Sequence, residues 1–168
     1  MKYKLVAFWL IVFGALFAFL QMCFEYHFYY IEQSQLFLFS EAYIRNKLLL
    51  PGGFSMLVAE FLVQFFIRPY VGALVTAVLL TGVGVCTAGI VKRIAPVSGL
   101  FILYVLPMLA LVFMHFDFNY RVQGTVCYLM MMALLCGYMR IRNDLFRLVA
   151  GCVLVPVLFW LAGSITVL

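Results

Sequence analysis

The chain has 168 residues, of which 68% are apolar and only 10% are charged. Soluble domains carry roughly 45–50% apolar and about 25% charged residues, so the composition excludes a soluble globular fold. The net charge of +5 would suggest nucleic acid in a soluble protein, but the basic residues here stand at the ends of apolar runs. We therefore expect no nucleic-acid partner, and an all-α polytopic transmembrane helical bundle, because the apolar runs are too long and continuous for barrel strands.

Five apolar runs follow one another along the chain, separated by polar breaks. A helix needs about 20 apolar residues to cross a hydrocarbon core ~30 Å thick. The first run follows Lys2 and Lys4 as a signal peptide would, but no small-residue cleavage site follows it, which favours an uncleaved anchor. The predicted spans are residues 5–24, 70–91, 97–114 (kinked at Pro107), 123–139 and 148–168. The last run stops at Leu168 without an interfacial anchor, which favours the N-terminal part of a longer protein or a truncated reading frame.

The basic residues predict the orientation of these spans, since Lys and Arg in short loops favour the cytoplasm. One side holds seven basic residues and the other holds four. The seven are Lys2, Lys4, Lys92, Arg93, Arg140, Arg142 and Arg147, and the four are Arg45, Lys47, Arg68 and Arg121. The N-terminus is therefore predicted to be cytoplasmic, and residues 25–69 form an extracytoplasmic segment.

The second predicted span carries small residues at spacings of three and four. They are Ala73, Ala77, Thr81, Gly84 and Ala88. Such a stripe lets two helix backbones approach closely, so it predicts either a tight helix–helix contact, including an oligomer face, or only the ordinary Gly and Ala content of membrane helices. The five cysteines show no metal or CxxC spacing and are interpreted as small buried hydrophobic residues.

The extracytoplasmic segment is rich in aromatic residues, which the membrane interface favours. Residues 34–50 are predicted to form a helix with Glu41 and Arg45 paired one turn apart. Pro51-Gly52-Gly53 ends that helix. Residues 54–68 are predicted to form an interfacial amphipathic helix whose polar residues fall in one line, namely Glu60, Gln64 and Arg68.

Candidate site residues lie where the first span continues outward. Glu25, Tyr29, Glu32 and Gln33 share one helix face, beside His27. Two carboxylates and an amide pointing the same way are suited to a general base, a metal ligand or a clamp on sugar hydroxyls. The alternative is that these groups only solvate the outer end of an aromatic helix. His115 and Asp117 open on the same side and are a weaker signal.

These residues define the predicted roles. Glu32, Glu25 and His27 are candidate catalytic residues, and Gln33, Tyr29, Glu60, Gln64 and Arg68 are candidate substrate contacts. The sequence does not identify a metal or another cofactor, and it contains no phosphate loop, HExxH or GxSxG motif.

The stretches His27 to Phe37, Pro51-Gly52-Gly53 and Phe61 to Ala73 resemble the start of an uncharacterised family of large bacterial multi-pass inner-membrane proteins. The resemblance covers residues 24–73 and implies a bacterial cytoplasmic membrane location and further spans, but no activity. A looser architectural likeness is to membrane glycosyltransferases that use polyprenyl-phosphate sugars, which also place surface helices and an acidic residue between spans one and two. This chain has Glu25 and Glu32 where those enzymes commonly have Asp.

Two functions remain open from the sequence. The first is an envelope enzyme, or part of one, that acts on membrane lipid or a lipid-linked sugar at the outer face of the membrane. The second is a non-catalytic membrane scaffold or transporter module. Polar residues are scarce within the predicted spans, which argues against an ion or proton pathway.

Overall fold

The computed structural model of the protein describes residues 2–94 and 101–163, and all regular structure in these ranges is helical. This confirms the all-α prediction. The elements are α1 (Lys2–Ser34), α2 (Glu41–Leu48), α3 (Gly53–Val63), the short 3-10 helix η1 (Gln64–Ile67), α4 (Val71–Ile94), α5 (Phe101–Met114), α6 (Val122–Tyr138) and α7 (Asp144–Ala162).

Three of the described helices, α1, α4 and α7, are long and apolar enough to cross a membrane by length and composition. The helices α5 and α6 are apolar as well but have 14 and 17 residues. Residues 97–100 of the third predicted span and 164–168 of the fifth lie outside the described residues. The helix α5 continues through Pro107, which lies inside it.

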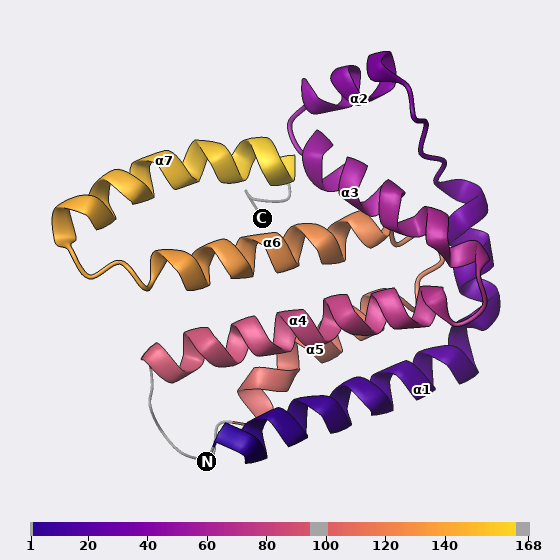
Figure 1. Cartoon of the computed structure of the whole chain (residues 1–168), viewed down its shortest axis with the longest axis horizontal. Coiled ribbons are helices and arrows are strands. Elements are labelled where there is room, and N and C mark those ends of the chain that lie inside the picture. The colour runs from indigo at the N-terminus through magenta and orange to yellow at the C-terminus, as the bar shows by residue number, and fades with distance from the viewer. Residues whose placement is uncertain (1, 95–100, 164–168) are drawn as a thin grey trace.

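The five long helices α1, α4, α5, α6 and α7 run back and forth along one direction (Figure 1). Helix α4 is central, since it contacts α1, α5, α6 and η1, whereas α7 contacts only α3 and α6 among the stronger helix pairs. The shared core joins α1, α3, η1, α4, α5 and α6 through side chains such as Leu20, Phe66, Leu80 and Met108.

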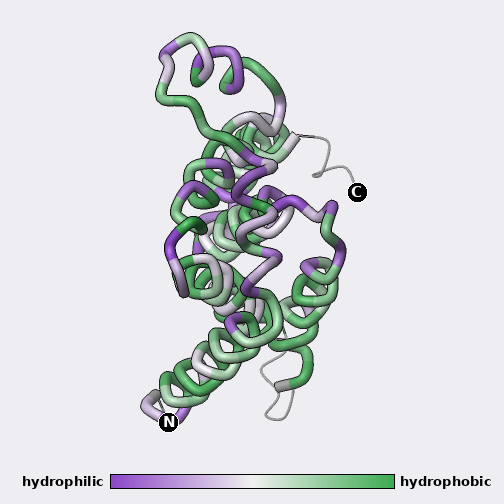
Figure 2. Tube along the Cα trace, turned by 90° about the vertical axis from the view of Figure 1, so that its right-hand side faces the viewer, coloured by the Kyte–Doolittle hydropathy of each residue, from purple (hydrophilic) through white to green (hydrophobic). Residues whose placement is uncertain are grey.

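The two ends of the bundle differ in composition. One end, here called the basic end, gathers the start of α1, the end of α4 and the α6–α7 connection (Figure 1). The other, here called the polar end, gathers residues 25–70, the α5–α6 loop and the end of α7. Figure 2 looks onto the polar end, where hydrophilic stretches of chain cross in front of the apolar helices.

Small residues allow α1 to pack closely on α4. A Cβ atom added at Gly72 would lie 2.7 Å from the Phe28 ring, and one added at Gly84 would lie 2.6 Å from the Trp9 ring. The stripe residues Ala73, Ala77, Gly84 and Ala88 are all buried within this single chain. The close approach that the stripe predicts is therefore made between helices of the same chain.

The segment between α1 and α4 differs in part from its prediction. Residues 34–50 do not form one helix, because α1 ends at Ser34, residues 35–40 are irregular, and α2 begins only at Glu41. The Ser34 hydroxyl donates to the Ile31 carbonyl oxygen at 2.9 Å and so occupies one of the last acceptors of α1. Helix α2 has Glu41 in its first turn and Arg45 and Lys47 in its last, as the helix dipole favours.

The Pro51-Gly52-Gly53 turn joins α2, α3 and α7. A Cβ atom at Gly53 would lie 1.7 Å from the Lys47 carbonyl oxygen, so only glycine permits this close return of the chain. Gly52 has a φ of +80°, which favours glycine as well. The Gly52 amide donates to the Trp160 carbonyl oxygen at 2.9 Å, which fixes the end of α7 against the turn.

Candidate functional site

The polar line of α3 and η1 does not face open water. Glu60 is only 6% exposed, and Gln64 is half-buried, whereas Phe61 and Phe65 on the predicted apolar face are about two-fifths exposed (40% and 42%). The predicted polar line is therefore covered at Glu60 and Gln64 within the fold, and the position of this helix at a membrane interface stays a prediction. The physical reason is that α2 and residues 35–40 fold over the polar line and supply its hydrogen-bond partners.

Glu60 is held by two side chains of α2. The Tyr43 hydroxyl donates to Glu60 Oε2 at 2.5 Å, and Lys47 Nζ donates to Glu60 Oε1 at 3.0 Å. Burial, followed by the hydrogen bond to Glu60, raises the pKa of Tyr43 to about 12, so this hydroxyl stays protonated and donates. Gln64 in turn donates to the Phe37 carbonyl oxygen at 2.8 Å. These polar groups are occupied in fastening α2 to α3, and Arg68 is exposed beyond them.

A second cluster lies where α5 ends. His115 is 1% exposed, and its Nε2 lies 3.0 Å from Thr125 Oγ1 of α6. The Tyr120 hydroxyl lies 3.2 Å from the same Thr125 oxygen, and its ring packs edge-on against His115. Burial, and then the proximity of His27, lower the pKa of His115 to about 4, so His115 is neutral at pH 7.

This cluster shapes the α5–α6 loop. Asp117 is exposed, and its Oδ1 accepts a hydrogen bond from the Asn119 amide at 2.9 Å. His115 therefore points into the bundle while Asp117 turns the loop outside it, and the two do not form a common site. The loop then reaches Arg121, the residue that precedes α6, which is held in an extended backbone conformation.

A cavity of about 270 Å³ lies between the outer end of α1 and this loop. We call it the loop pocket. Its lining comprises Tyr30, Ile31, Ser34, Gln35, Phe118, Asn119, Tyr120 and Arg121. Hydroxyls, amides and one guanidinium dominate its polar part, and Arg121 is its only charged residue. Such a lining can bind a phosphate or another anion through charge-assisted hydrogen bonds, with neutral donors and acceptors for hydroxyl groups.

The predicted carboxylate face lies elsewhere on α1. Glu25 and Gln33 are exposed, and Tyr29 and Glu32 are half-buried, but none of these four lines the loop pocket. Ser34 follows Glu25 by about two and a half helical turns, so the two side chains leave α1 on opposite sides. The structure also separates this face from Glu60 and Gln64, whose hydrogen bonds go to α2 and Phe37.

His27 is not beside the carboxylates, because it belongs to the packed side of α1. It is 5% exposed, and the rings of Phe24 and Phe118 lie 5.8 and 5.0 Å from its own. Its Nε2 is buried and has no hydrogen-bond partner. Within the described residues, no group of three or more His, Cys, Asp or Glu side chains is placed to hold a metal ion.

Sequence reasoning missed most of the loop pocket. Tyr30 and Ser34 lie on the side of α1 opposite the carboxylates, and Gln35 directly follows that helix. Asn119, Tyr120 and Arg121 come from a loop that is distant in sequence. The available signal was the prediction that the loop from His115 to Arg121 opens on the same side as residues 25–69.

Comparison with known proteins identifies a family but no activity. No curated protein and no solved structure matches the chain. The chain does match a family model along residues 1–168, and the description of that family is "Family of unknown function (DUF6057)". This agrees with the expectation of an uncharacterised family, and the chain belongs to it.

Proposed function

We propose that the chain is a polytopic protein of the bacterial cytoplasmic membrane that binds a lipid-linked sugar phosphate or a related phospholipid at its extracytoplasmic end. The observation that carries the proposal is the loop pocket, with Arg121 as the only charged residue of its lining. A phosphate on a lipid carrier is the kind of anion that such a pocket fits, and the sugar would meet the neutral hydroxyl and amide groups.

The arrangement of the ends supports the proposed orientation. The seven basic residues that favour the cytoplasm belong to the start of α1, the end of α4, the α6–α7 connection and the start of α7, which share the basic end (Figure 1). The loop pocket belongs to the opposite, polar end. We propose that all five long helices cross the membrane, so that the pocket faces the extracytoplasmic side.

The pocket supports binding more directly than it supports a reaction. No carboxylate lines it, and Glu25 and Glu32 leave α1 on other sides. A general base must come within about 3 Å of the proton that it removes, and these carboxylates are not directed at the pocket. We therefore propose that the chain contributes the recognition part of envelope glycan or lipid processing.

The experiment compares polyprenyl phosphate with the corresponding polyprenol, which lacks the phosphate, as ligands of the purified protein in detergent. We expect the phosphate to bind at least about tenfold more tightly, since charge-assisted hydrogen bonds carry the difference. Arg121→Gln should remove this preference. Arg142→Gln, a change of the same kind at an exposed position of the basic end, is the matched control and should retain it.

A third variant distinguishes the loop pocket from the predicted polar line of Glu60, Gln64 and Arg68. If Arg68→Gln removes the preference while Arg121→Gln retains it, the phosphate is bound at the polar line that ends in Arg68, and the loop pocket is the wrong site. Equal binding of phosphate and alcohol by the wild-type protein would contradict the proposed function as a whole.

A second candidate is a non-catalytic membrane scaffold, and the exposure of α7 favours it. Leu145, Leu148, Val155 and other apolar residues of α7 are exposed over most of the helix, as an interface to another protein would require. A scaffold should bind polyprenol and its phosphate equally and should lose its partner when α7 is made polar.

A further inference from the structure

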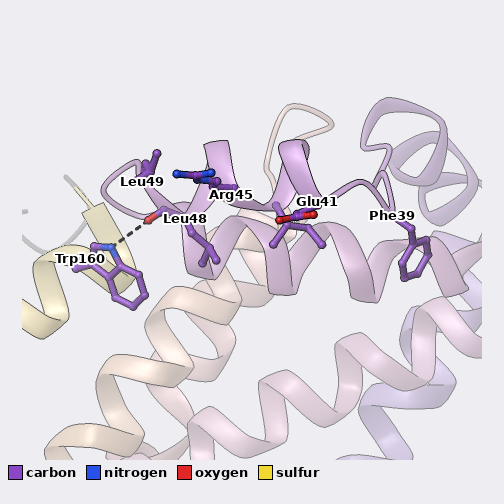
Figure 3. A pocket seen from close by; sticks show the side chains of 7 residues that line it. Phe39, Glu41, Arg45, Leu48, Leu49 and Trp160 are labelled. Carbon is purple, nitrogen blue, oxygen red and sulfur yellow. Dashed lines mark hydrogen bonds between the residues drawn. The ribbon is translucent and has the colours of Figure 1, made fainter.

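A second cavity, of about 750 Å³, lies between α2 and the end of α7. We call it the α2–α7 groove. Its lining is Phe39, Glu41, Ile44, Arg45, Leu48, Leu49 and Trp160, so most of its surface is apolar and its two charges have opposite sign. Figure 3 shows Arg45 and Glu41 following one another along α2, with Trp160 of α7 beside Leu48 at one end of that helix.

The two charges of the groove are free to bind a ligand. The one ion pair within 4 Å among the described residues joins Lys47 and Glu60, so the predicted pairing of Glu41 with Arg45 is not formed. Both side chains are exposed, and they stand one turn apart on α2, where Cβ atoms are about 5–6 Å from each other. The groove therefore presents a cation and an anion at neighbouring positions.

The wall formed by α7 is fixed in place. Trp160 Nε1 donates to the Leu48 carbonyl oxygen at 3.1 Å (Figure 3), and the Trp160 ring stacks on Phe54 with a centroid distance of 6.1 Å. The ring is still 44% exposed. Tryptophan in this setting, with its N–H bonded and its ring half-covered, is typical of the head-group level of a membrane.

An exposed apolar stripe continues from the groove along α7. Val157, Val153 and Val149 precede Trp160 at helical spacing and are all at least two-fifths exposed (40%, 57% and 51%). Charges at the outer end of such a stripe match the chemistry of a phospholipid, whose polar head adjoins its acyl chains. A lipid whose head group carries only a negative charge would place that charge beside the Glu41 carboxylate, which repels it.

We propose that the α2–α7 groove binds a phospholipid whose head group carries both a phosphate and an ammonium. Arg45 binds the phosphate, Glu41 binds the ammonium, and the acyl chains lie along the stripe of α7. This site is separate from the loop pocket, and it stands whether or not the loop pocket binds a sugar phosphate.

The experiment reconstitutes the protein in vesicles of equal parts phosphatidylethanolamine and phosphatidylglycerol and counts the lipids retained after detergent extraction by native mass spectrometry. Phosphatidylglycerol has the phosphate without the ammonium. We expect the wild-type protein to retain phosphatidylethanolamine about threefold more often, the size expected for one exposed charge pair. Glu41→Gln should abolish this preference, whereas Arg45→Gln should lower the retention of both lipids.

Asp144→Asn, which removes an exposed carboxylate at the basic end, is the matched control and should leave the preference unchanged. Equal retention of the two lipids by the wild-type protein would overturn the proposal, and so would an Asp144→Asn effect as large as that of Glu41→Gln. Retention of neither lipid would overturn it as well. Quenching of Trp160 by brominated phosphatidylethanolamine, measured in a Trp9→Phe background, provides a second readout, and its absence would also overturn the proposal.

Discussion

The helices α4 and α7 are equally apolar, yet α4 lies at the centre of the fold and α7 at its edge. Their most apolar windows have the same mean hydropathy. Helix α4 nevertheless buries eleven of its residues, whereas α7 buries only Ala162. Hydropathy therefore identifies helices that can cross a membrane by length and composition, but it does not distinguish a helix packed inside the bundle from one that lies exposed at its edge.

Side-chain size explains the difference better than hydropathy does. Gly72 and Gly84 leave room on α4 for the Phe28 and Trp9 rings of α1, and the alanines of the same helix are fully buried. Helix α7 presents mainly branched and aromatic side chains and is fastened at its end, through Gly52 and Trp160. We call α1, α4, α5 and α6 the packed half, and we expect it to respond to mutation more strongly than α7.

The largest expected effect concerns His115, which lies at the end of the packed half. Its pKa falls from 6.5 to about 4 on folding, so between these pH values the unfolded chain binds a proton that the folded protein does not. Stability should therefore decrease as the pH falls from 6.5 to 4, by up to about 3 kcal/mol. The melting temperature of the wild-type protein in detergent, measured across this pH range, tests the expectation.

The variant His115→Gln isolates this contribution, because glutamine retains a polar group for Thr125 but does not titrate. The difference in melting temperature between the wild-type protein and the variant should shrink as the pH falls towards 4. A difference that stays constant with pH would show that His115 is protonated in the folded protein, or that it is reached by solvent.

The next expected effect is on the contact between α1 and α4. Gly84→Val should destabilise the protein by about 1–3 kcal/mol, because the added side chain meets the buried Trp9 ring, which packs against Ala88 and Tyr104. Gly137→Val is the matched control on α6, since an added Cβ atom there meets nothing within 4 Å. Similar losses for both variants would show that valine disturbs these helices generally and would remove the distinction between packed and open glycines.

Much of the fold followed from periodicity and composition. Long apolar runs predict helices close to α4 and α6, and Pro51-Gly52-Gly53 predicts the break before α3. The irregular residues 35–40 could not be predicted, because their course depends on Gln64 and Glu60, which bind Phe37 and α2 from a distant part of the chain. Local sequence favoured a helix there, and tertiary hydrogen bonds determined where it begins.

The site was harder to predict than the fold. Helical spacing correctly places Glu25, Tyr29, Glu32 and Gln33 on one side of α1, but it cannot show which side the α5–α6 loop approaches. The loop approaches the side of Tyr30 and Ser34, because His115 and Tyr120 are anchored to Thr125. The same limit applies to the polar line of α3, since only the position of α2 shows that Glu60 is covered.

The smallest expected effect compares the two tryptophans of the chain, one in the packed half and one on α7. Trp9→Phe should cost about 1–2 kcal/mol, because Trp9 is 9% exposed and a smaller ring leaves space against Gly84. Trp160→Phe should cost less than about 1 kcal/mol, since it removes one exposed hydrogen bond to Leu48 while a ring remains to stack on Phe54. Thermal midpoints of the two variants in the same detergent measure the difference. If Trp160→Phe proves the costlier change, the end of α7 is an integral part of the folded core, and the comparison between α4 and α7 fails at that point.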